Sequence, residues 1–502
     1  TQEATEDRDS WDIRIPEGVR EVIGRRLNRL TDRCNETLTI GAVIGREFEL
    51  RQLTQLVDDM SEDRLLEVLE EGLSARVIEE MPNAVGRYEF THALIQQTLM
   101  AELSTTRRVR LHARIIGVFE ELYGDSVDTH AVTLAYHAAE AEAMIGPDKL
   151  LQYSIMAGER DLDAHAFEDA LAHFQRALAA RENQTMDDQL ASILFGIGRA
   201  MAPTMPVPEG QPVWDAMSPA FEYYVEQGDF QKAVSVAIHP IPVLGGISGA
   251  ADLFVRAIEL VPRDSLQAGY LLSRRAISVV VEYGDFEASE NCAMEAISIA
   301  RQHNDVVLQA RSLAYLSMTF GYQCRNQEAI DAGLEAIELA IAIGDLQAEQ
   351  RARNAVAGSY VNIGEPIKAK SHAESGLRAA EKLRDRTFQG GNSFQAGRSA
   401  AYRGDWATAD KLIEAHLEIA PTSFRILGLK ATLSLLKDDS NATKRQLEEM
   451  LKLPMGDLAV AGCAPRIAYE TGIEEYTDLA DTALEFVASS AALLWNITSK
   501  RN

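Results

Sequence analysis

A period of 40 residues restricts the fold of this chain more than any other feature of its sequence. Two sets of positions recur with this period: the small residues Ser289, Ala329, Ala369 and Ala409, and, five positions earlier, Gly284, Cys324, Gly364 and Gly404. A glycine ends a helix where the chain must turn, and a small residue in the next helix lets two backbones approach closely. Each period therefore predicts a helical hairpin. One hairpin cannot bury its apolar face alone, so successive hairpins are expected to stack into a superhelix.

The same register extends outward from these four periods. The segment 164–180 carries Phe167, Ala170, Phe174 and Ala177 at matching offsets. The first helices of the hairpins are expected to begin near residues 150, 187, 230, 265, 305, 345, 387, 421 and 456. Residues 128–502 thus predict a superhelix of about nine hairpins with no strand. Proline-rich stretches near 203–219 and 240–246 predict irregular or easily opened turns.

The N-terminal part follows a different pattern. Residues 1–15 predict a linker, and residues 16–127 predict a separate arm domain. Its expected helices cover residues 16–30, 32–44, 49–58, 62–75, 92–103 and 105–123. Two segments that resemble short strands, Val77–Met81 and Arg87–Phe90, flank a turn that contains Pro82, Asn83 and Gly86, which predicts a β-hairpin. Helices beside a small hairpin are typical of a winged-helix-like domain, so the fold class is mainly all-α.

Several segments resemble known families. The stretches AFEDALAHFQRALAA and GDWATADKLIEAHLEIA resemble the tetratricopeptide repeat in its longer form of about 40 residues. The stretches IPEGVREVIGRRLNRL, AVIGREFEL and YEFTHALIQQTLMAEL resemble the region that follows the nucleotide-binding module in bacterial STAND-class signal-transduction ATPases. That class includes MalT-like and large LuxR-type regulators and ATPase-linked adenylate or guanylate cyclases. The resemblance implies an ATPase domain in cis, N-terminal to the winged-helix arm and the repeats.

Two departures from the family pattern bear on function. The sequence contains no GxxxxGK[ST], so the loop that cradles phosphates is missing, and ATP and Mg²⁺ are expected only on an N-terminal domain outside this chain. The C-terminal stretch SSAALLWNITSKRN does not resemble a LuxR-type helix-turn-helix, which favours the cyclase-linked or stand-alone ATPase branch. The chain begins with Thr1, and we expect it to be a piece of a longer protein.

Charge and composition exclude other classes. The 502 residues include 76 acidic and 49 basic ones, giving a net charge of −27, which disfavours nucleic acid and anionic membranes as partners. Arginines cluster over residues 20–33 and 107–114, and these are interpreted as solvated or paired within the protein. No apolar run approaches the roughly 18 residues of a membrane helix, and the N-terminus has no signal-peptide core. Four well-separated cysteines suggest reduced thiols, so a cytoplasmic location is expected.

No catalytic constellation is visible. The sequence lacks HExxH and GxSxG, and its histidines are scattered at helical positions, where packing or solvent exposure is the simpler interpretation. Its adjacent acidic pairs are read as solvated faces. We therefore predict no catalytic, metal-binding or cofactor-binding residue in this chain, and no enzymatic activity of its own.

The concave groove of the superhelix is the predicted ligand site. In this repeat type the first helix of each hairpin lines the groove. Transferring that register selects Arg274, Arg311, Tyr322, Arg351, Asn354, Asn362, Arg398 and Tyr402. Arginine is suited to planar carboxylates and phosphates. The alternative is that each arginine pairs with a neighbouring acidic residue and only keeps the groove soluble.

Three functional hypotheses follow. The first is a non-catalytic sensor and protein-interaction module, which binds a peptide, protein or small effector in the groove and biases the arm. The second is the regulatory half of a class III nucleotide cyclase or an NTPase whose catalytic domains precede this chain. The third is a transcriptional activator that contacts DNA through the winged helix. The coding sequence upstream of Thr1 would discriminate among them.

Overall fold

The computed structural model describes residues 23–489, apart from 83, 182–184, 205–209, 240–248, 384, 420, 454–459, 461–462, 466, 470–471 and 473. It divides into two compact units, Thr1–Thr185 and Met186–Asn502, which are considered separately. The predicted linker over residues 1–15 and the predicted first helix up to residue 22 lie outside the described residues, as does the last predicted hairpin start near residue 456.

The first unit combines short helices with a small sheet. Its first elements are α2 (Asp32–Ile44), β1 (Glu47–Glu49), α3 (Leu50–Leu56), α4 (Glu62–Ser74), β2 (Ile78–Glu80), β3 (Arg87–Phe90), α5 (Ala93–Ala101) and α6 (Thr105–Tyr123). The predicted hairpin is present as β2 and β3. An antiparallel third strand, β1, pairs with the other side of β3, giving the order β1-β3-β2.

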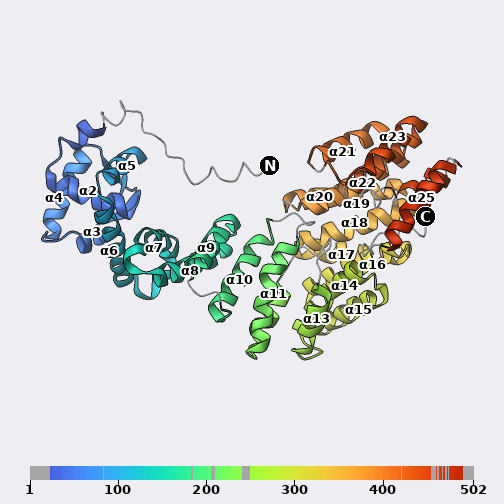
Figure 1. Cartoon of the computed structure of the whole chain (residues 1–502), viewed down its shortest axis with the longest axis horizontal. Helices are drawn as coiled ribbons and strands as arrows, with labels where there is room; N and C mark the ends of the chain where they lie inside the picture. The colour runs from blue at the N-terminus through green and yellow to red at the C-terminus, as the bar shows by residue number, and fades with distance from the viewer. Residues whose placement is uncertain are drawn as a thin grey trace. The chain divides into compact units, whose positions relative to one another are not determined.

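Strand β1 was not expected, because residue 49 was assigned to the following helix. Its sequence is Glu-Phe-Glu, too short to show a two-residue period. Phe48 is 2% exposed and packs against the rings of Tyr88 and Phe90 in β3, while the two glutamates flank it. Burial of one aromatic side chain between two charged residues therefore determines how β1 packs beside β3. Together with the helices, the three strands form the winged-helix-like part of a mainly α-helical chain (Figure 1).

The first unit continues through further helices after the sheet. These are the 3-10 segment η1 (Gly124–His130), α7 (Ala131–Ile145), α8 (Pro147–Asp163) and α9 (Phe167–Ala180). One hydrophobic core runs from the winged-helix-like part into α8. The helix pair α8–α9, expected as the first hairpin of the superhelix, thus belongs to the first compact unit. Whether the division at residues 127 and 128 separates two autonomous domains stays a prediction.

Two buried histidines lie in the interior of this unit. His112 of α6 and His137 of α7 have no exposed surface, and their Nδ1 atoms are 2.8 Å apart. Burial lowers the pKa of both side chains, and the charge of Arg108 adds to the effect on His112. The pair is therefore neutral near pH 7, with one imidazole donating to the other.

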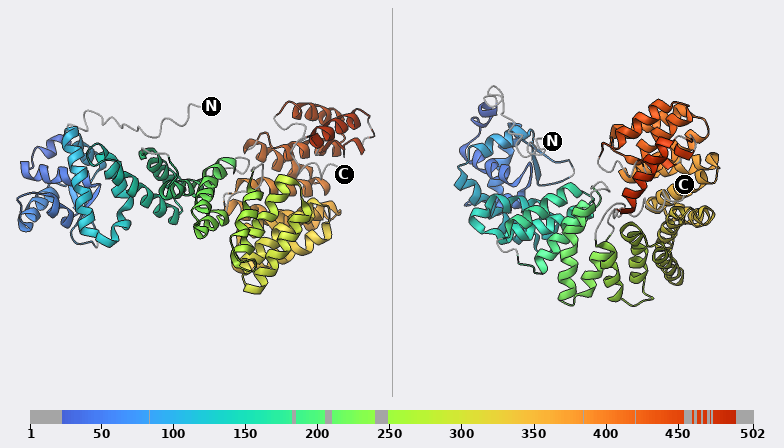
Figure 2. Two further views of the ribbon diagram at one scale, coloured as in Figure 1. Left: turned by 60° about the horizontal axis from the view of Figure 1, so that its bottom comes forward. Right: turned by 45° about the vertical axis from the view of Figure 1, so that its right-hand side comes forward.

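The second unit is a succession of paired antiparallel helices. They are α10 (Asp188–Met201), α11 (Gly210–Glu226), α12 (Phe230–Ile238), α13 (Ala250–Glu259), α14 (Leu266–Tyr283), α15 (Phe286–His303), α16 (Val306–Tyr322), α17 (Asn326–Ile343), α18 (Leu346–Asn362), α19 (Pro366–Lys382), α20 (Arg386–Tyr402), α21 (Trp406–Ile419), α22 (Phe424–Leu436), α23 (Ser440–Met450) and α25 (Glu474–Ser489). The predicted first-helix starts from 187 to 421 agree with this within three residues. The architecture is a tetratricopeptide-like helical repeat, as predicted. Figure 2 shows α14–α21 lying side by side from two further directions.

The predicted small residues are buried where two helices of a pair cross. Ser289, Ala329, Ala369 and Ala409 are all fully buried. Glycine at the end of a first helix supplies a left-handed conformation, as at Gly284 with φ of 65°. Cys324 adopts the same conformation with φ of 58°, so the turn tolerates a residue with a side chain. The 40-residue period therefore arises from two structural requirements: the close approach of paired helices and the turns between them.

Candidate functional site: the first-helix face

The first helices α14, α16, α18 and α20 contact one another in series and form one face of the second unit. We call it the first-helix face. All eight predicted groove residues lie on these four helices. The structure separates them into residues that are committed to packing or pairing and residues with unused hydrogen-bonding capacity.

An aspartate before each later first helix makes the same two contacts three times. Asp305, Asp345 and Asp385 are the N-caps of α16, α18 and α20, and the Oδ1 atom of each accepts a backbone N–H from its own helix. The Oδ2 atom of each accepts a hydrogen bond from the preceding first helix. The donors are Tyr270 Oη at 3.0 Å, Arg311 Nε at 2.7 Å and Gln350 Nε2 at 2.7 Å, respectively. We refer to these three contacts as cap clasps, because each caps one helix and ties it to the repeat before.

Arg274 is a packing residue. It is 9% exposed, and its Nη1 donates to the carbonyl of Ile238 at 2.7 Å, at the end of α12. Its guanidinium also lies 5.3 Å from the ring centroid of Phe254. The side chain therefore satisfies the carbonyl end of α12, where a positive charge is favourable. The prediction that Arg274 contacts a ligand did not take this neighbouring helix end into account.

Arg311 is partly committed. Its Nε is bound in the cap clasp to Asp345, whose side chain is 8% exposed, while the Arg311 side chain is 32% exposed. No hydrogen-bond partner of its two Nη groups occurs among the described residues. One edge of the Arg311 guanidinium therefore binds Asp345, and the other edge faces solvent or a ligand.

Arg351 is the least committed arginine of the face. Its guanidinium lies 5.4 Å from the ring centroid of Tyr315 and 5.4 Å from that of Phe388, so two aromatic rings on neighbouring first helices hold it. Its Nε is buried without a hydrogen-bond partner. No carboxylate pairs with Arg351 in the part of the chain that the structure describes. A buried donor without an acceptor costs about 1–3 kcal/mol.

Asn354, one helical turn further along α18, also has a hydrogen-bond donor without a partner. Its Nδ2 is buried without a partner. The atom faces the backbone of α20 at Gly391, where an added Cβ would come within 3.0 Å of it. The missing side chain at Gly391 is what leaves room for Asn354. Arg351 and Asn354 therefore bring unused donors to the same stretch of α18.

The remaining predicted residues join neighbouring repeats. Arg398 Nη2 donates to Asn362 Oδ1 at 2.8 Å, and Asn362 Nδ2 donates to Asn326 Oδ1 at 3.2 Å. Tyr322 and Tyr402 are half-buried and pack against apolar clusters of the first helices. These four residues lie at the C-terminal ends of the first helices and link adjacent hairpins there.

The positive charges of the face influence one another. The pKa of Arg274 is lowered to about 10, mainly by burial and further by the charges of Arg351 and Arg311. Cations from α14, α16 and α18 are thus close enough to interact. Their mutual repulsion is relieved when an anion binds among them.

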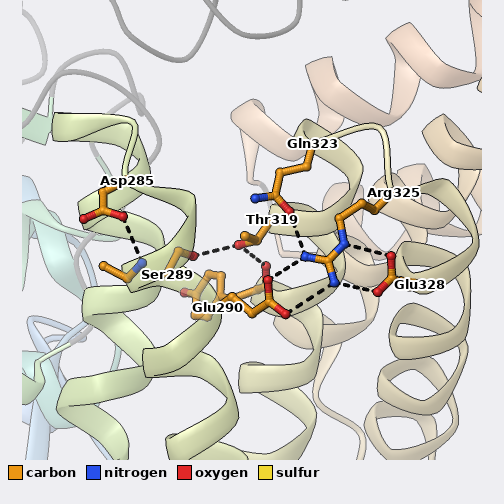
Figure 3. Close-up of polar contacts among 9 residues, drawn as sticks. Asp285, Ser289, Glu290, Thr319, Gln323, Arg325 and Glu328 are labelled. Atoms are coloured by element: carbon orange, nitrogen blue, oxygen red, sulfur yellow. Dashed lines mark hydrogen bonds and ion pairs between the residues drawn. The ribbon is translucent and has the colours of Figure 1, made fainter.

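Arg325 provides a contrast at the turn between α16 and α17. Figure 3 shows its guanidinium between Glu290 of α15 and Glu328 of α17, with Gln323 as a further acceptor at 3.0 Å. Hydrogen bonds to Glu328 and Glu290 hold its pKa above the usual range. This cation was not among the predicted residues. With carboxylates on both sides it serves as a structural clamp rather than a ligand site.

The first unit also has an open cavity, of about 510 Å³, beside its β-hairpin. The two arginines in its lining, Arg51 and Arg87, both pair with Glu49, and Arg87 also lies 3.4 Å from Glu47, so two carboxylates balance the two charges. Elsewhere in this unit Arg114 makes a two-pronged contact with Asp58 at 2.9 and 3.1 Å, and Arg108 lies 3.8 Å from Glu140. Part of the arginine cluster near residue 110 is therefore paired within the protein.

The described ranges contain neither a cluster of metal ligands nor a helix that could span a membrane. No three His, Cys, Asp or Glu side chains there are placed as metal ligands. None of the described helices has both the length and the apolar character required to cross a bilayer.

Comparisons with known proteins find similar solved structures. No protein-family model matches the sequence, and no curated protein matches it significantly. A STAND protein with a tetratricopeptide repeat sensor from Pyrococcus horikoshii is 13% identical over 92% of this chain and 67% of its own, with a TM-score of 0.45. A Rap protein complexed with competence and sporulation factor is 13% identical over 79% and 98%, with a TM-score of 0.43. Yeast Tom70 is 11% identical over 78% and 94%, with a TM-score of 0.31. At these values function must be argued from the chain's own residues.

Proposed function

We propose that this chain is a non-catalytic interaction module whose first-helix face binds an extended peptide or protein segment carrying a carboxylate or a similar planar anion. The observation that carries the proposal is Arg351. It is held between two aromatic rings, has a buried donor without an acceptor, and has no carboxylate partner among the described residues. Helical repeats present long surfaces of this kind and need no catalytic residue to use them.

The neighbours of Arg351 suggest how such a ligand would lie. One repeat before it, the Nη groups of Arg311 have no partner among the described residues, and one turn after it, the Asn354 amide has a buried donor without a partner. A carboxylate accepts paired N–H groups from a guanidinium, while a side-chain amide can donate to a peptide carbonyl. Donors spread over α16 and α18 favour an extended ligand over a compact one.

In the wider proposal this module acts as the sensor of a signal-transduction ATPase. Resemblance of the sequence to STAND-class proteins supports it: the ATPase would precede the winged-helix arm in cis, in the cytoplasm, and hold the ATP and Mg²⁺. The output would be nucleotide cyclisation, transcription or scaffolding, depending on the attached domains. The coding sequence upstream of residue 1 tests this part, since a GxxxxGK[ST] motif there would support the ATPase and its absence would leave an adaptor.

The binding proposal is tested with a fluorescein-labelled decapeptide of alternating Glu and Ser, and a matched peptide of alternating Gln and Ser. Fluorescence anisotropy is expected to show tighter binding of the Glu peptide. Arg351→Met retains the packing between the rings but removes the charge. It is expected to weaken Glu-peptide binding by about 10- to 100-fold, since a charge-assisted hydrogen bond contributes about 1.5–3 kcal/mol.

Arg325→Met is the matched control, because it removes an arginine that is already saturated by two glutamates. It is expected to lower the thermal midpoint and leave the affinity unchanged. Equal affinity of wild type and Arg351→Met for the Glu peptide, or equal binding of the Glu and Gln peptides, would contradict the proposal.

A further inference from the structure

The three cap clasps differ in one respect. Their donors are a tyrosine hydroxyl, an arginine Nε and a glutamine amide, all at 2.7–3.0 Å from an aspartate Oδ2. Since Tyr270 and Gln350 make the contact without a charge, the structural task does not require a cation. The charge of Arg311 is therefore surplus to the clasp, and so is the carboxylate charge of Asp345 that neutralises it.

The cap itself does not require that negative charge either. The Oδ1 atom of Asp345 accepts the backbone N–H groups of Gln347 and Ala348 at 3.0 Å each. An asparagine Oδ1 accepts the same bonds, and asparagine is as good an N-cap as aspartate. What asparagine cannot do is neutralise Arg311, because it would turn an N–H₂ group toward the guanidinium.

We propose that Asp345 is a specificity-determining residue of the first-helix face: it serves as an internal counter-anion that occupies Arg311 and limits the affinity of the face for anionic ligands. The inference rests on the function proposed above and names the residue that limits the affinity for the ligand. A ligand carboxylate at Arg351 would lie one repeat from Arg311, whose charge Asp345 already neutralises. Replacing Asp345 by asparagine frees a full positive charge beside that ligand.

The neighbouring clasp provides the control. Asp385→Asn removes the same charge from the N-cap of the next first helix, but its partner is the neutral Gln350, so no cation is freed. Both variants keep a good cap, although Asp345→Asn also loses an ion pair and is expected to have the lower thermal midpoint. Any difference in anion affinity between them therefore reports the contact with Arg311 and not the long-range effect of one charge.

The experiment measures anisotropy with the Glu-Ser decapeptide and its Gln-Ser counterpart on the full 502-residue chain. Asp345→Asn is expected to bind the Glu peptide about five- to tenfold more tightly than wild type, with a steeper salt dependence, because the charge of Arg311 is no longer neutralised by Asp345. Asp385→Asn is expected to change the affinity less than twofold. Arg311→Gln, which copies the Gln350–Asp385 clasp, is expected to weaken binding, and the double variant Arg311→Gln/Asp345→Asn is expected to return close to wild type.

The outcomes separate this inference from the function on which it rests. If wild type binds the Glu peptide and Arg351→Met does not, but Asp345→Asn is no tighter than Asp385→Asn, the counter-anion role is wrong and the proposed function stands. If only Asp345→Asn binds, the inference holds in its strongest form. If neither wild type nor any variant prefers the Glu peptide, both are overturned.

Discussion

The core around the sheet of the first unit and the stack of α14–α21 in the second unit are filled by side chains of different size. The first unit packs large side chains around a small sheet, with Phe48, Phe90 and Phe119 all at most 2% exposed. The stack of α14–α21 instead brings helices together over alanine, serine and glycine, such as Ala329, whose side chains have no exposed surface. A large interlocked core suffers when atoms are removed, whereas a core of small residues suffers when atoms are added. The comparison therefore predicts opposite sensitivities to mutation.

Phe90→Ala is expected to have the largest effect. Phe90 is fully buried in β3, and its ring lies 5.4 Å from that of Phe48. Truncation leaves a cavity, and we expect a loss of about 3–5 kcal/mol in the stability of the first unit, measured by denaturant unfolding. Ala329→Gly, which removes the whole side chain of a fully buried residue in the second unit, is expected to cost only about 1 kcal/mol. Equal losses would contradict the distinction between the two cores.

Lowering the pH is expected to destabilise the first unit through His112 and His137. Their pKa values are lowered by burial in the folded state, whereas the unfolded chain takes up protons near pH 6.5. The neutral pair therefore contributes its full stability above pH 6.5, and this contribution falls as the pH drops from 6.5 toward about 4. We expect a loss on the order of 2–4 kcal/mol over that window, followed by calorimetry at a series of pH values.

Two variants test the cause of this pH dependence. His112→Leu removes one titrating group, so its stability is expected to fall less steeply below pH 6.5, although it starts lower because His137 loses its partner. His165→Asn changes an exposed histidine with a φ of 60°, a conformation that asparagine tolerates, and should leave the slope of the wild type unchanged. Parallel profiles for His112→Leu and wild type would show that other groups cause the dependence.

Gly333→Val is expected to have a smaller effect than Phe90→Ala and to act through crowding. A Cβ at Gly333 of α17 would lie 2.3 Å from Cγ2 of Val356 and 2.7 Å from Oγ of Ser317, so the paired helices must move apart. We expect a loss of about 1–3 kcal/mol in the second unit, measured as a shift in denaturation midpoint. Gly117→Ala in α6 meets no atom within 4 Å and should instead stabilise the first unit by up to about 1 kcal/mol. Tolerance of Gly333→Val would refute close helix approach there.

Sequence analysis predicted the repeat because its signal is local: a small residue and a turn residue recur at fixed spacing, and both follow from helix geometry. The winged-helix-like part was harder, since β1 depends on Phe48 meeting β3 some 40 residues later, which no local pattern shows. The register of the first helices assigns both Arg311 and Arg351 to one face. It could not distinguish them, because Asp345 reaches Arg311 and not Arg351 only once the helices are stacked.

The cap clasps also bear on how such a chain can change length during evolution. Each clasp accepts donors as different as tyrosine, arginine and glutamine, provided that an aspartate precedes the next first helix. A deletion of residues 306–345 would join Asp305 directly to Leu346, so Tyr270 would still meet an aspartate at the start of the following helix. Whole periods can therefore be lost or duplicated without leaving an unpaired junction. Because the cap clasp accepts different donors, the number of repeats can vary while the side chains along the first-helix face change.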